Sequence, residues 1–589
     1  MILTFSFLGI YNMASDKTML VAAIDFGTTY SGYAFSLRHT YEKDPLKIHA
    51  NQAWNAGGRQ LLSLKTPTCL LLDNNKKFVS FGYEAENEYA NLAMDGEQDK
   101  YYYFYRFKMK LHNNKHITSD MAVEDITGRT LPAIDVFSMS IRALKDHLLE
   151  ELEKQGTGLK VDEIKWVLTV PAIWSDSAKQ FMRASAEKAE IPGERLLIAL
   201  EPEAASIYCQ HLPIEKLQGA KTGFSMSKKG TKFMIIDLGG GTADITVHEK
   251  LDGTRLKELC KASGDACGGT SVDNAFFQTF VKILGGPVMR KLQKKYTSSY
   301  MDLFREFETL KRTIKNSTSG KVNFTVPYVV LDQICKEDLD EDFPKTVKAS
   351  TLADKLSILG DKIRFDAEFM KSLFKPTIDN IITHVKDVLR KKESGNVDIF
   401  LLVGGFSESP MIQEAVRKAF PNTRVIVPED SGISVLKGAV LFGHRPDFIS
   451  SRIARYTYGV KIAQEFDPAK HDERKKYRIG NVAHCNDVFS SFMKADTSVL
   501  AGQKVVKGYT TTSPFQPQMG LRVYYTPSED PKYVDDDGCS LLGELDINVP
   551  NPSAENHQLA VEFHFGNTEL SVTAVEIPSL TPCKAKFKL

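Results

Sequence analysis

Two short segments of the chain share a pattern that could bind phosphate. Each begins with an Asp and continues into a glycine-rich turn: Asp25-Phe-Gly-Thr-Thr-Tyr30 and Asp237-Leu-Gly-Gly-Gly-Thr242. Each follows a run of apolar residues, at 21–24 and 233–236, and leads into another strand-like run, which predicts strand, tight turn and strand. Glycine lets the backbone approach a ligand closely, so main-chain N–H groups and Thr hydroxyls can converge on phosphate oxygens. The pair of turns therefore predicts a nucleoside triphosphate held between two similar lobes.

Asp25 and Asp237 stand at the end of a strand-like run, immediately before each turn. A carboxylate cannot hold phosphate directly, but it can hold the water shell of Mg²⁺, which prefers oxygen ligands and gives up its waters reluctantly. We therefore expect both side chains to hold a metal ion through water. The turns do not match the Walker sequence GxxxxGK[ST] or the dinucleotide sequence GxGxxG, each of which leads into a helix. The alternative is a pair of glycine-rich hairpins without a ligand, which the duplication makes less favoured.

Length and composition limit the classes of protein to consider. The 589 residues, with a mass of 65.9 kDa, exceed the usual size of one hydrophobic core, so we expect two or more domains. Lys and Arg total 75 against 74 for Asp and Glu, and a net charge of +1 does not favour nucleic acid or an anionic membrane as a partner. Eight cysteines form no CxxC pair, which favours a reducing compartment. No apolar run reaches the roughly 18 residues that a membrane span needs, and we expect a cytoplasmic protein.

Strands alternate with helices through most of the chain, which is typical of a layered α/β domain. The strand-like run 164–170, for example, lies between two helical segments. The pattern recurs after Asp237 and includes a third glycine-rich turn, where the apolar run 399–403 leads to Gly404-Gly405 before a helix. This recurrence indicates an internal duplication, with the ligand in the cleft between the two halves.

The character of the sequence changes after residue 445, where helical patterns fade and Thr, Val, Tyr, Phe and turn residues increase. Alternating apolar residues predict strands at 521–525, 541–549 and 559–565. We therefore expect a two-lobed α/β domain followed by a smaller, mostly β domain. The expected divisions are an N-terminal extension at 1–19, a nucleotide-binding domain at 20–445, a linker at 446–455 and a β-rich domain at 456–589.

The order of these motifs resembles that of the 70-kDa heat-shock protein chaperones and of the wider actin and sugar-kinase ATPase superfamily. The run Phe307-Glu-Thr-Leu-Lys-Arg-Thr-Ile-Lys-Asn-Ser-Thr318 is similar to the adenosine-binding helix of the chaperones. Three segments resemble the divergent branch called heat shock 70 kDa protein 12: Phe107-Lys-Met-Lys-Leu-His112, Val170-Pro-Ala-Ile-Trp-Ser175 and Gly404-Gly-Phe-Ser-Glu408. The resemblance implies a duplicated actin-like ATPase domain with Mg²⁺ and ATP or ADP in its cleft, followed by a mostly β substrate- or partner-binding domain.

The resemblance also implies roles for particular residues. Lys108 would neutralise charge that develops on the γ-phosphoryl, Asp237 and Glu201 would position metal or attacking water, and Thr242 would contact the γ-phosphate. Two alternatives stay open, because Lys110 could replace Lys108 and Glu201 could cap the helix that follows it. The residues implied at the phosphates are Gly27, Thr28, Thr29, Tyr30, Gly239, Gly240, Gly241, Thr242, Gly268 and Gly269. The residues implied around the adenosine are Glu308, Lys311, Arg312, Lys315, Gly404, Gly405 and Phe406.

Three features depart from the chaperone pattern. Glu408 stands where the chaperones have an Arg that stacks on adenine, and Phe406 and Lys315 replace small residues, so we expect a rebuilt base pocket. The segment 445–451 lacks the leucine-rich acidic character of the chaperone linker. Residues 584–589 end the chain before the helical lid and the acidic motif that co-chaperones bind, so we expect no co-chaperone docking through the C-terminus.

The leading hypothesis from the sequence is an atypical chaperone-type ATPase that hydrolyses ATP slowly and binds unfolded segments or partner polypeptides through its β domain. The alternative is an ATP-binding regulatory scaffold with little or no ATPase activity, whose β domain docks a folded protein. A small-molecule kinase of the same superfamily is least favoured, because it would need an acceptor pocket with a catalytic carboxylate base and would not explain the β domain.

Overall fold

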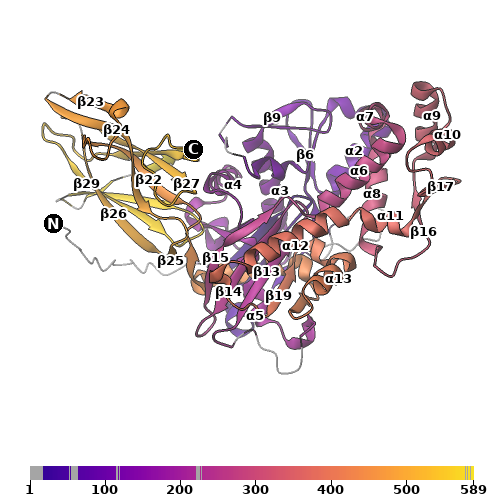
Figure 1. Ribbon diagram of the computed structural model, residues 1–589, viewed down its shortest axis with the longest axis horizontal. Coiled ribbons are helices and arrows are strands. Elements are labelled where there is room, and N and C mark those ends of the chain that lie inside the picture. Colours follow the sequence, from indigo (N-terminus) through magenta and orange to yellow (C-terminus); the bar gives the residue numbers. More distant parts are fainter. Residues whose placement is uncertain are drawn as a thin grey trace.

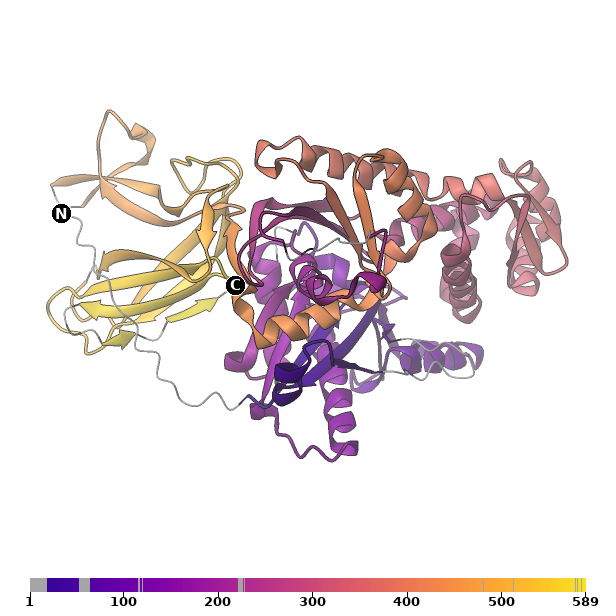
Figure 2. The same cartoon turned by 90° about the horizontal axis from the view of Figure 1, so that it is seen from below.

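The computed structural model places two α/β lobes side by side and an all-β part at one end of the molecule (Figures 1 and 2). The predicted N-terminal extension at 1–19 lies outside the described residues except for Thr18 and Met19. The structure describes residues 18–51, 54, 64–114, 117–118, 120–220, 226, 228–479, 481–511, 513–577, 579, 581–583 and 585–588.

The first lobe is built on a sheet in the order β11-β10-β1-β2-β3, with β4 paired to β2. β1 and β2 form an antiparallel hairpin around the first glycine turn, and β1 runs parallel to β10. β1 is buried along its whole length, which explains its nearly continuous apolar sequence. The strands of this sheet are β1 (Leu20–Phe26), β2 (Tyr30–Leu37), β3 (His49–Ala50), β4 (Thr66–Pro67), β10 (Ile164–Val170) and β11 (Leu196–Leu200).

The second lobe repeats this arrangement around the second glycine turn. β13 and β14 form the antiparallel hairpin, β13 runs parallel to β19, and β19 runs parallel to β20. The duplication predicted from the opening motifs is therefore present in strand order and direction. The strands of this sheet, in spatial order, are β12 (Leu217–Gln218), β20 (Arg424–Pro428), β19 (Ile399–Val403), β13 (Lys232–Leu238), β14 (Ala243–Lys250), β15 (Leu256–Asp265), β21 (Ile449–Ile453) and β25 (Ser498–Leu500).

Two helices, α5 (Glu201–His211) and α14 (Ser434–His444), pack together between the lobes. Their backbones nearly touch, because a Cβ added at Gly438 would lie 1.7 Å from the carbonyl oxygen of Ala204. One buried core includes residues of both helices and of both sheets. α5 therefore has a fixed position relative to both glycine turns.

The remaining helices and small sheets surround this centre. In the first lobe they are α1 (Arg38–Lys43), β5 (Cys69–Leu72), β6 (Phe78–Phe81), α2 (Tyr83–Met94), β7 (Tyr102–Tyr105), β8 (Ala122–Glu124), β9 (Thr130–Pro132), α3 (Ala133–Lys154) and α4 (Asp176–Lys188). In the second they are α6 (Gly269–Leu284), α7 (Gly286–Lys295), α8 (Thr297–Thr313), β16 (Lys321–Thr325), α9 (Tyr328–Leu339), α10 (Phe343–Ala349), β17 (Leu356–Leu359), β18 (Lys362–Asp366), α11 (Ala367–Ser372), α12 (Lys375–Leu389) and α13 (Pro410–Ala419). None of the helices among the described residues has the length and apolar character that crossing a bilayer requires.

The all-β part packs two sheets, β23-β24-β22-β27-β28-β32 and β26-β29-β30-β31, around one apolar core. The strands predicted at 521–525, 541–549 and 559–565 are confirmed as β27, β28 and β29, with β28 ending one residue before the predicted end. Past His444, the described residues form strands and short 3-10 turns and no α-helix. The strands are β22 (Thr457–Glu465), β23 (Lys476–Ile479), β24 (Val482–Met493), β26 (Gln503–Thr510), β27 (Gln518–Thr526), β28 (Ser540–Asn548), β29 (Gln558–Phe565), β30 (Ser571–Ile577), β31 (Pro582–Cys583) and β32 (Ala585–Lys588).

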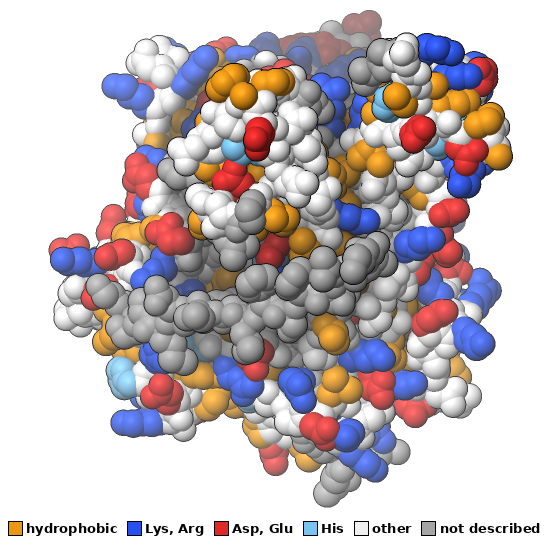
Figure 3. Space-filling view, turned by 90° about the vertical axis from the view of Figure 1, so that its left-hand side faces the viewer, with side chains coloured by type: hydrophobic (Ala, Val, Ile, Leu, Met, Phe, Trp, Pro, Cys, Tyr) orange, Lys and Arg blue, Asp and Glu red, His pale blue; other side chains and the backbone are white. Residues whose placement is uncertain are grey.

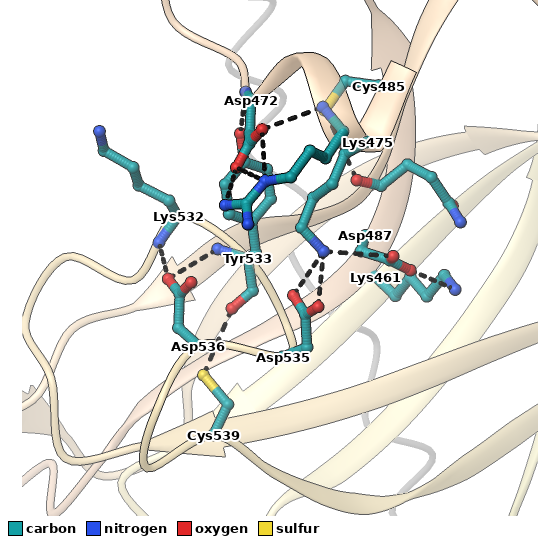
Figure 4. A network of polar contacts seen from close by, with 12 residues as sticks. Lys461, Asp472, Lys475, Cys485, Asp487, Lys532, Tyr533, Asp535, Asp536 and Cys539 are labelled. Carbon is teal, nitrogen blue, oxygen red and sulfur yellow. Dashed lines mark hydrogen bonds and ion pairs between the residues drawn. The ribbon is translucent and has the colours of Figure 1, made fainter. Parts of the chain in front are cut away.

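A polar network joins two loops of the all-β part (Figure 4). The Lys475 ammonium lies 2.6 Å from an oxygen of Asp535 and 4.9 Å from the centre of the Tyr533 ring. The Tyr533 hydroxyl accepts a hydrogen bond from the backbone N–H of Asp472, and Asp536 accepts two from backbone N–H groups. These contacts hold the loop before β23 against the loop before β28.

The segment predicted as a linker contains a strand of the second lobe's sheet. Within residues 446–455, β21 pairs in parallel with β15 and antiparallel with β25, which belongs to the segment that follows β24. The structure thus connects the α/β lobes to the all-β part through sheet hydrogen bonds and not through a free tether.

Ion pairs reinforce this junction. Arg452 of β21 forms a bidentate pair with the buried carboxylate of Glu203 in α5, with both N–O distances 2.7 Å, and also donates to the carbonyl of Gly566. Arg183 of α4 forms a second bidentate pair, with Glu569, at 2.7 Å for both bonds. The first pair matters most for stability because both of its side chains are nearly excluded from water.

Replacing Arg452 tests this junction. We expect Arg452→Met to lower the free energy of unfolding by about 3–5 kcal/mol, because the Glu203 carboxylate would remain buried without its partner. Chemical denaturation measures the change. The control is Arg522→Met, which breaks an exposed pair with Glu544 and should cost less than about 1 kcal/mol. Equal, small losses in the two variants would contradict the assignment.

Glu258 of β15 lies in the same junction and makes the stability of the folded protein depend on pH. Burial, with the charge of Glu203, raises the pKa of Glu258 to about 8, against opposition from the Ile453 N–H, Arg452 and Lys179. A carboxyl whose pKa is raised in the folded state binds more protons there than in the unfolded state, so stability falls as pH rises from about 4.5 to 8.

We expect Glu258→Gln to flatten this dependence. The variant should come close to the wild type near pH 5 and exceed its stability at pH 8 by on the order of 4 kcal/mol, since one pKa unit corresponds to about 1.4 kcal/mol. Thermal or chemical unfolding across this pH range measures the effect. Parallel curves for the two proteins would show that Glu258 ionises as an ordinary carboxyl.

Candidate functional site

The two glycine turns lie against each other across the lobes. A Cβ added at Gly240 would lie 2.3 Å from the hydroxyl oxygen of Thr29, and one added at Gly241 would lie 2.5 Å from that of Thr28. Such an approach is open only to glycine. The fold therefore brings together the hydroxyl side chains of one turn and the backbone of the other, as a phosphate site between the lobes requires.

Two further glycine segments close this region. The N–H of Gly269 donates to the carbonyl of Gly239, and the Cβ of any larger residue at Gly268 would lie 2.6 Å from the carbonyl oxygens of Gly239 and Gly240. Gly404, at φ +85°, faces Asp237, whose Oδ1 would lie 2.4 Å from an added Cβ. The four glycine segments predicted to surround a nucleotide thus meet at one place.

Four buried acidic side chains stand around these turns: Asp25, Glu201, Asp237 and Asp244. The Lys108 ammonium, nearly excluded from water, lies 2.9 Å from Glu201 Oε1. Asp244 accepts a hydrogen bond from the N–H of Ile173 at 2.9 Å. The cluster gathers residues from both lobes and from the N-terminus of α5.

The structure bears on the two alternatives that the sequence left open, Lys110 in place of Lys108 and helix capping by Glu201. Lys108 is 2% exposed, whereas Lys110 is exposed on the other side of the same 3-10 turn, Phe107–Leu111. Glu201 is the first residue of α5, and its carboxylate reaches Lys108 in a separate segment. This geometry favours Lys108 over Lys110 and a site role for Glu201 over simple helix capping.

Burial shifts the protonation of the cluster. Burial raises the pKa of Glu201 to about 7, although the Lys108 ammonium opposes the shift. Burial, together with the charges of Glu201, Asp244 and Asp25, raises the pKa of Asp237 well above its ordinary value. Asp25 behaves differently, because Lys65, with help from Lys108 and Thr169, overcomes burial and holds the pKa of Asp25 below its ordinary value.

The segment predicted to bind adenosine, 307–318, begins in α8 and continues past its end at Thr313. The Lys311 ammonium lies 2.7 Å from Asp273 and 2.6 Å from Glu308, and Arg312 pairs with Glu308. The Arg312 guanidinium stands 5.7 Å from the centre of the Tyr30 ring. The structure therefore connects the predicted adenosine helix to the first glycine turn.

The structure places the residues that the sequence expected to line a rebuilt base pocket as follows. Phe406 is buried, and its ring edge would lie 3.4 Å from a Cβ added at Gly269. Glu408 accepts a hydrogen bond from the N–H of Gly432 at 3.1 Å. Lys315 is exposed, beyond the C-terminal end of α8, and Gly405 is exposed, with nothing within 4 Å of an added Cβ.

Sequence reasoning missed four side chains of this region: Lys65, Thr169, Asp244 and Asp273. Lys65 Nζ lies 2.6 Å from Asp25 Oδ2, and Thr169 donates to Asp25 Oδ1 at 2.8 Å. The only local signal for Lys65 is its place beside Thr66-Pro67. These two residues form β4, and the pairing of β4 with β2 was not predicted. Thr169 gave no signal beyond its position near the end of a buried strand that runs parallel to β1.

The acidic residues suit a hydrated cation. Asp237 Oδ2 is buried and has no hydrogen-bond partner among the described residues, and a buried acceptor of this kind calls for a donor or a cation. Among all the residues that the structure describes, no three His, Cys, Asp or Glu side chains come close enough to ligate one ion directly. The residues present therefore fit an ion that keeps its own water shell between itself and Asp237.

Fold and site together define a two-lobed protein of the actin-like ATPase fold. Comparison with known sequences identifies the family: a profile described as "Hsp70 protein" matches residues 94–466, and the chain belongs to the Hsp70 family. The chain is 35% identical to human heat shock 70 kDa protein 12B, with 96% of this chain and 90% of the relative aligned. It is 34% identical to the human and mouse 12A proteins, covering 91% and 90% of their lengths. It falls in the 12A and 12B branch.

Gly268 offers a steric test of the site. We expect Gly268→Ala to weaken nucleotide binding at least about tenfold, because the new methyl group would push apart the backbones of the second turn and the start of α6. Isothermal titration measures the affinity. Gly508→Ala is the control, since nothing lies within 4 Å of a Cβ added there in β26. Unchanged affinity in Gly268→Ala would remove this segment from the site.

Proposed function

We propose that the protein binds Mg-ATP between its lobes, hydrolyses it slowly, and uses its all-β part to bind unfolded segments or partner polypeptides. The observation that carries the proposal is the convergence of four glycine segments on a group of carboxylates, one of which, Glu201, pairs with Lys108. Membership of the Hsp70 family supports nucleotide binding at this position. Mg²⁺, when bound, would offset part of the phosphate charge.

The chain's own residues suit hydrolysis at this place. Lys108 supplies a positive charge where the γ-phosphoryl develops negative charge, and Thr242 lies in the turn that faces the phosphates. Glu201 is placed to accept a hydrogen bond from an attacking water, and a pKa near 7 matches that of a group that exchanges a proton at neutral pH. Its pairing with Lys108 keeps the two side chains in one arrangement.

The junction supports communication between the site and the all-β part. Glu201 and Glu203 both belong to the first turn of α5, and Glu203 holds Arg452 of β21. The Thr568 hydroxyl also donates to the carbonyl of Ile198, at 2.7 Å, in the strand that leads into α5. A change at Glu201 thus reaches the all-β part through two short paths.

The all-β part presents a mixed surface. On the end of the molecule that it forms, basic and acidic side chains alternate with small apolar patches (Figure 3). Large apolar side chains that are exposed there include Val506, Phe515 and Leu541. This surface suits a polypeptide partner better than a polyanion. All eight cysteines are free thiols and seven are buried, which supports the proposal of a cytoplasmic location.

A second candidate is an ATP-binding regulatory scaffold with little or no ATPase activity. Two observations favour it. The Lys65 ammonium pairs with Asp25, and Glu408 and Phe406 replace the residues that the chaperones have at the base. The scaffold predicts nucleotide binding with turnover near background, and no competition between extended peptides and a folded partner.

Phosphate release from Mg-ATP by the full chain separates the candidates. We expect Asp237→Asn and Lys108→Met each to slow turnover about 100-fold, because the first removes a carboxylate oxygen that is open to a hydrated cation and the second removes a positive charge. Lys110→Met, on the exposed side of the same 3-10 turn, is the control and should keep the wild-type rate. Stimulation by an extended apolar peptide would support the chaperone. Binding without turnover or peptide response would support the scaffold.

A further inference from the structure

Lys65 places a second lysine in the nucleotide site. It directly precedes β4, which pairs with the start of β2 beside the first glycine turn. Its stem crosses β2 at Gly32, where an added Cβ would lie 3.1 Å from Lys65 Cγ. The ammonium reaches the end of β1, 2.6 Å from Asp25 Oδ2, and the side chain is only 18% exposed.

Both carboxylate oxygens of Asp25 have a partner. One carboxylate oxygen receives Lys65 and the other receives the Thr169 hydroxyl at 2.8 Å. Asp237, the equivalent residue of the second lobe, shows the opposite state, because its Oδ2 is buried with no partner among the described residues. The two lobes therefore carry the same motif with different electrostatics: a cation of the chain serves Asp25, and Asp237 is open to an external cation.

Charge counting shows the effect of this lysine. Four carboxylates face two lysines, Lys65 and Lys108, so the fully ionised cluster carries a net charge of −2, against −3 if Lys65 were neutral. A nucleotide adds further negative charge to the same buried space, where opposite charges interact more strongly than in water. Lys65 therefore supplies part of the positive charge that nucleotide binding requires.

We propose that the Lys65 ammonium is a built-in cation that takes over, at Asp25, the neutralising role of a divalent metal ion. The site then retains a nucleoside diphosphate or triphosphate when divalent cations are removed. This inference rests on the proposed nucleotide binding and deepens it, by assigning Lys65 the part of binding that would otherwise depend on Mg²⁺.

The test is the affinity of the full chain for ADP and ATP, measured by isothermal titration with excess Mg²⁺ and with excess EDTA. We expect the wild type to lose less than about tenfold in affinity on chelation, and Lys65→Met to lose more than about 100-fold, an additional effect of at least a factor of ten. Lys65→Arg should keep the weak dependence, because it retains the charge.

Two controls separate this role from folding. Lys65→Gln keeps a polar side chain beside Asp25 without the charge. Nucleotide-free thermal unfolding checks that the variant is folded, and the folded variant should show the strong Mg²⁺ dependence of the Met variant. Lys229→Met removes an exposed lysine that pairs with Asp252 on the surface, and should leave the Mg²⁺ dependence unchanged.

The outcomes are distinct. If the wild type needs Mg²⁺ as strictly as Lys65→Gln, the built-in cation is overturned and nucleotide binding stands. If none of the proteins binds ADP or ATP with or without Mg²⁺, the proposed function fails together with this inference. The inference is established if the nucleotide affinity of the wild type and of Lys65→Arg depends weakly on Mg²⁺ and that of Lys65→Gln depends on it strongly.

Discussion

The balance of charge among buried carboxylates governs this structure. Asp25, Glu201, Asp237 and Asp244 meet where strands of both lobes end, in a space from which most water is excluded. A buried charge is costly unless it is paired, so the site needs cations. The chain provides two of them, and leaves Asp237 without a partner among the described residues. Lys65 and Lys108 meet this requirement in part, and Asp237 is left open to an external cation.

The same requirement reappears at the junction with the all-β part, where Arg452 neutralises Glu203. Because Glu201 and Glu203 share the first turn of α5, one helix carries both the site's carboxylate and the junction's carboxylate. The near contact of α5 and α14 at Gly438 leaves this helix little room to move without shifting the lobes. The mechanical relation between the two parts of the molecule is thus built around a single rigid element.

The duplicated lobes are alike in topology and unlike in chemistry. Strand order and direction repeat, yet among the described residues a lysine pairs with the Asp of the first lobe and Asp237 Oδ2 has no hydrogen-bond partner. On the adenosine side, Arg312 stays close to Tyr30, whereas Phe406 and Glu408 change the surfaces that would meet the base. The chain therefore keeps the two-lobed frame of the Hsp70 family, and its two lobes differ in the side chains around their glycine turns.

The sequence by itself determined the features that depend on local periodicity: the two strand-turn-strand motifs, the alternation of strands and helices up to residue 445, and the strands β27, β28 and β29. These follow from patterns within a few residues, since burial alternates with a fixed period and tight turns need glycine. Only the tertiary structure decided that Lys65 meets Asp25, 40 residues away, that Arg452 meets Glu203, 249 residues away, and that the predicted linker contains a strand of the second sheet. Such contacts depend on strand order, strand register and the packing of α5, and no local pattern encodes them.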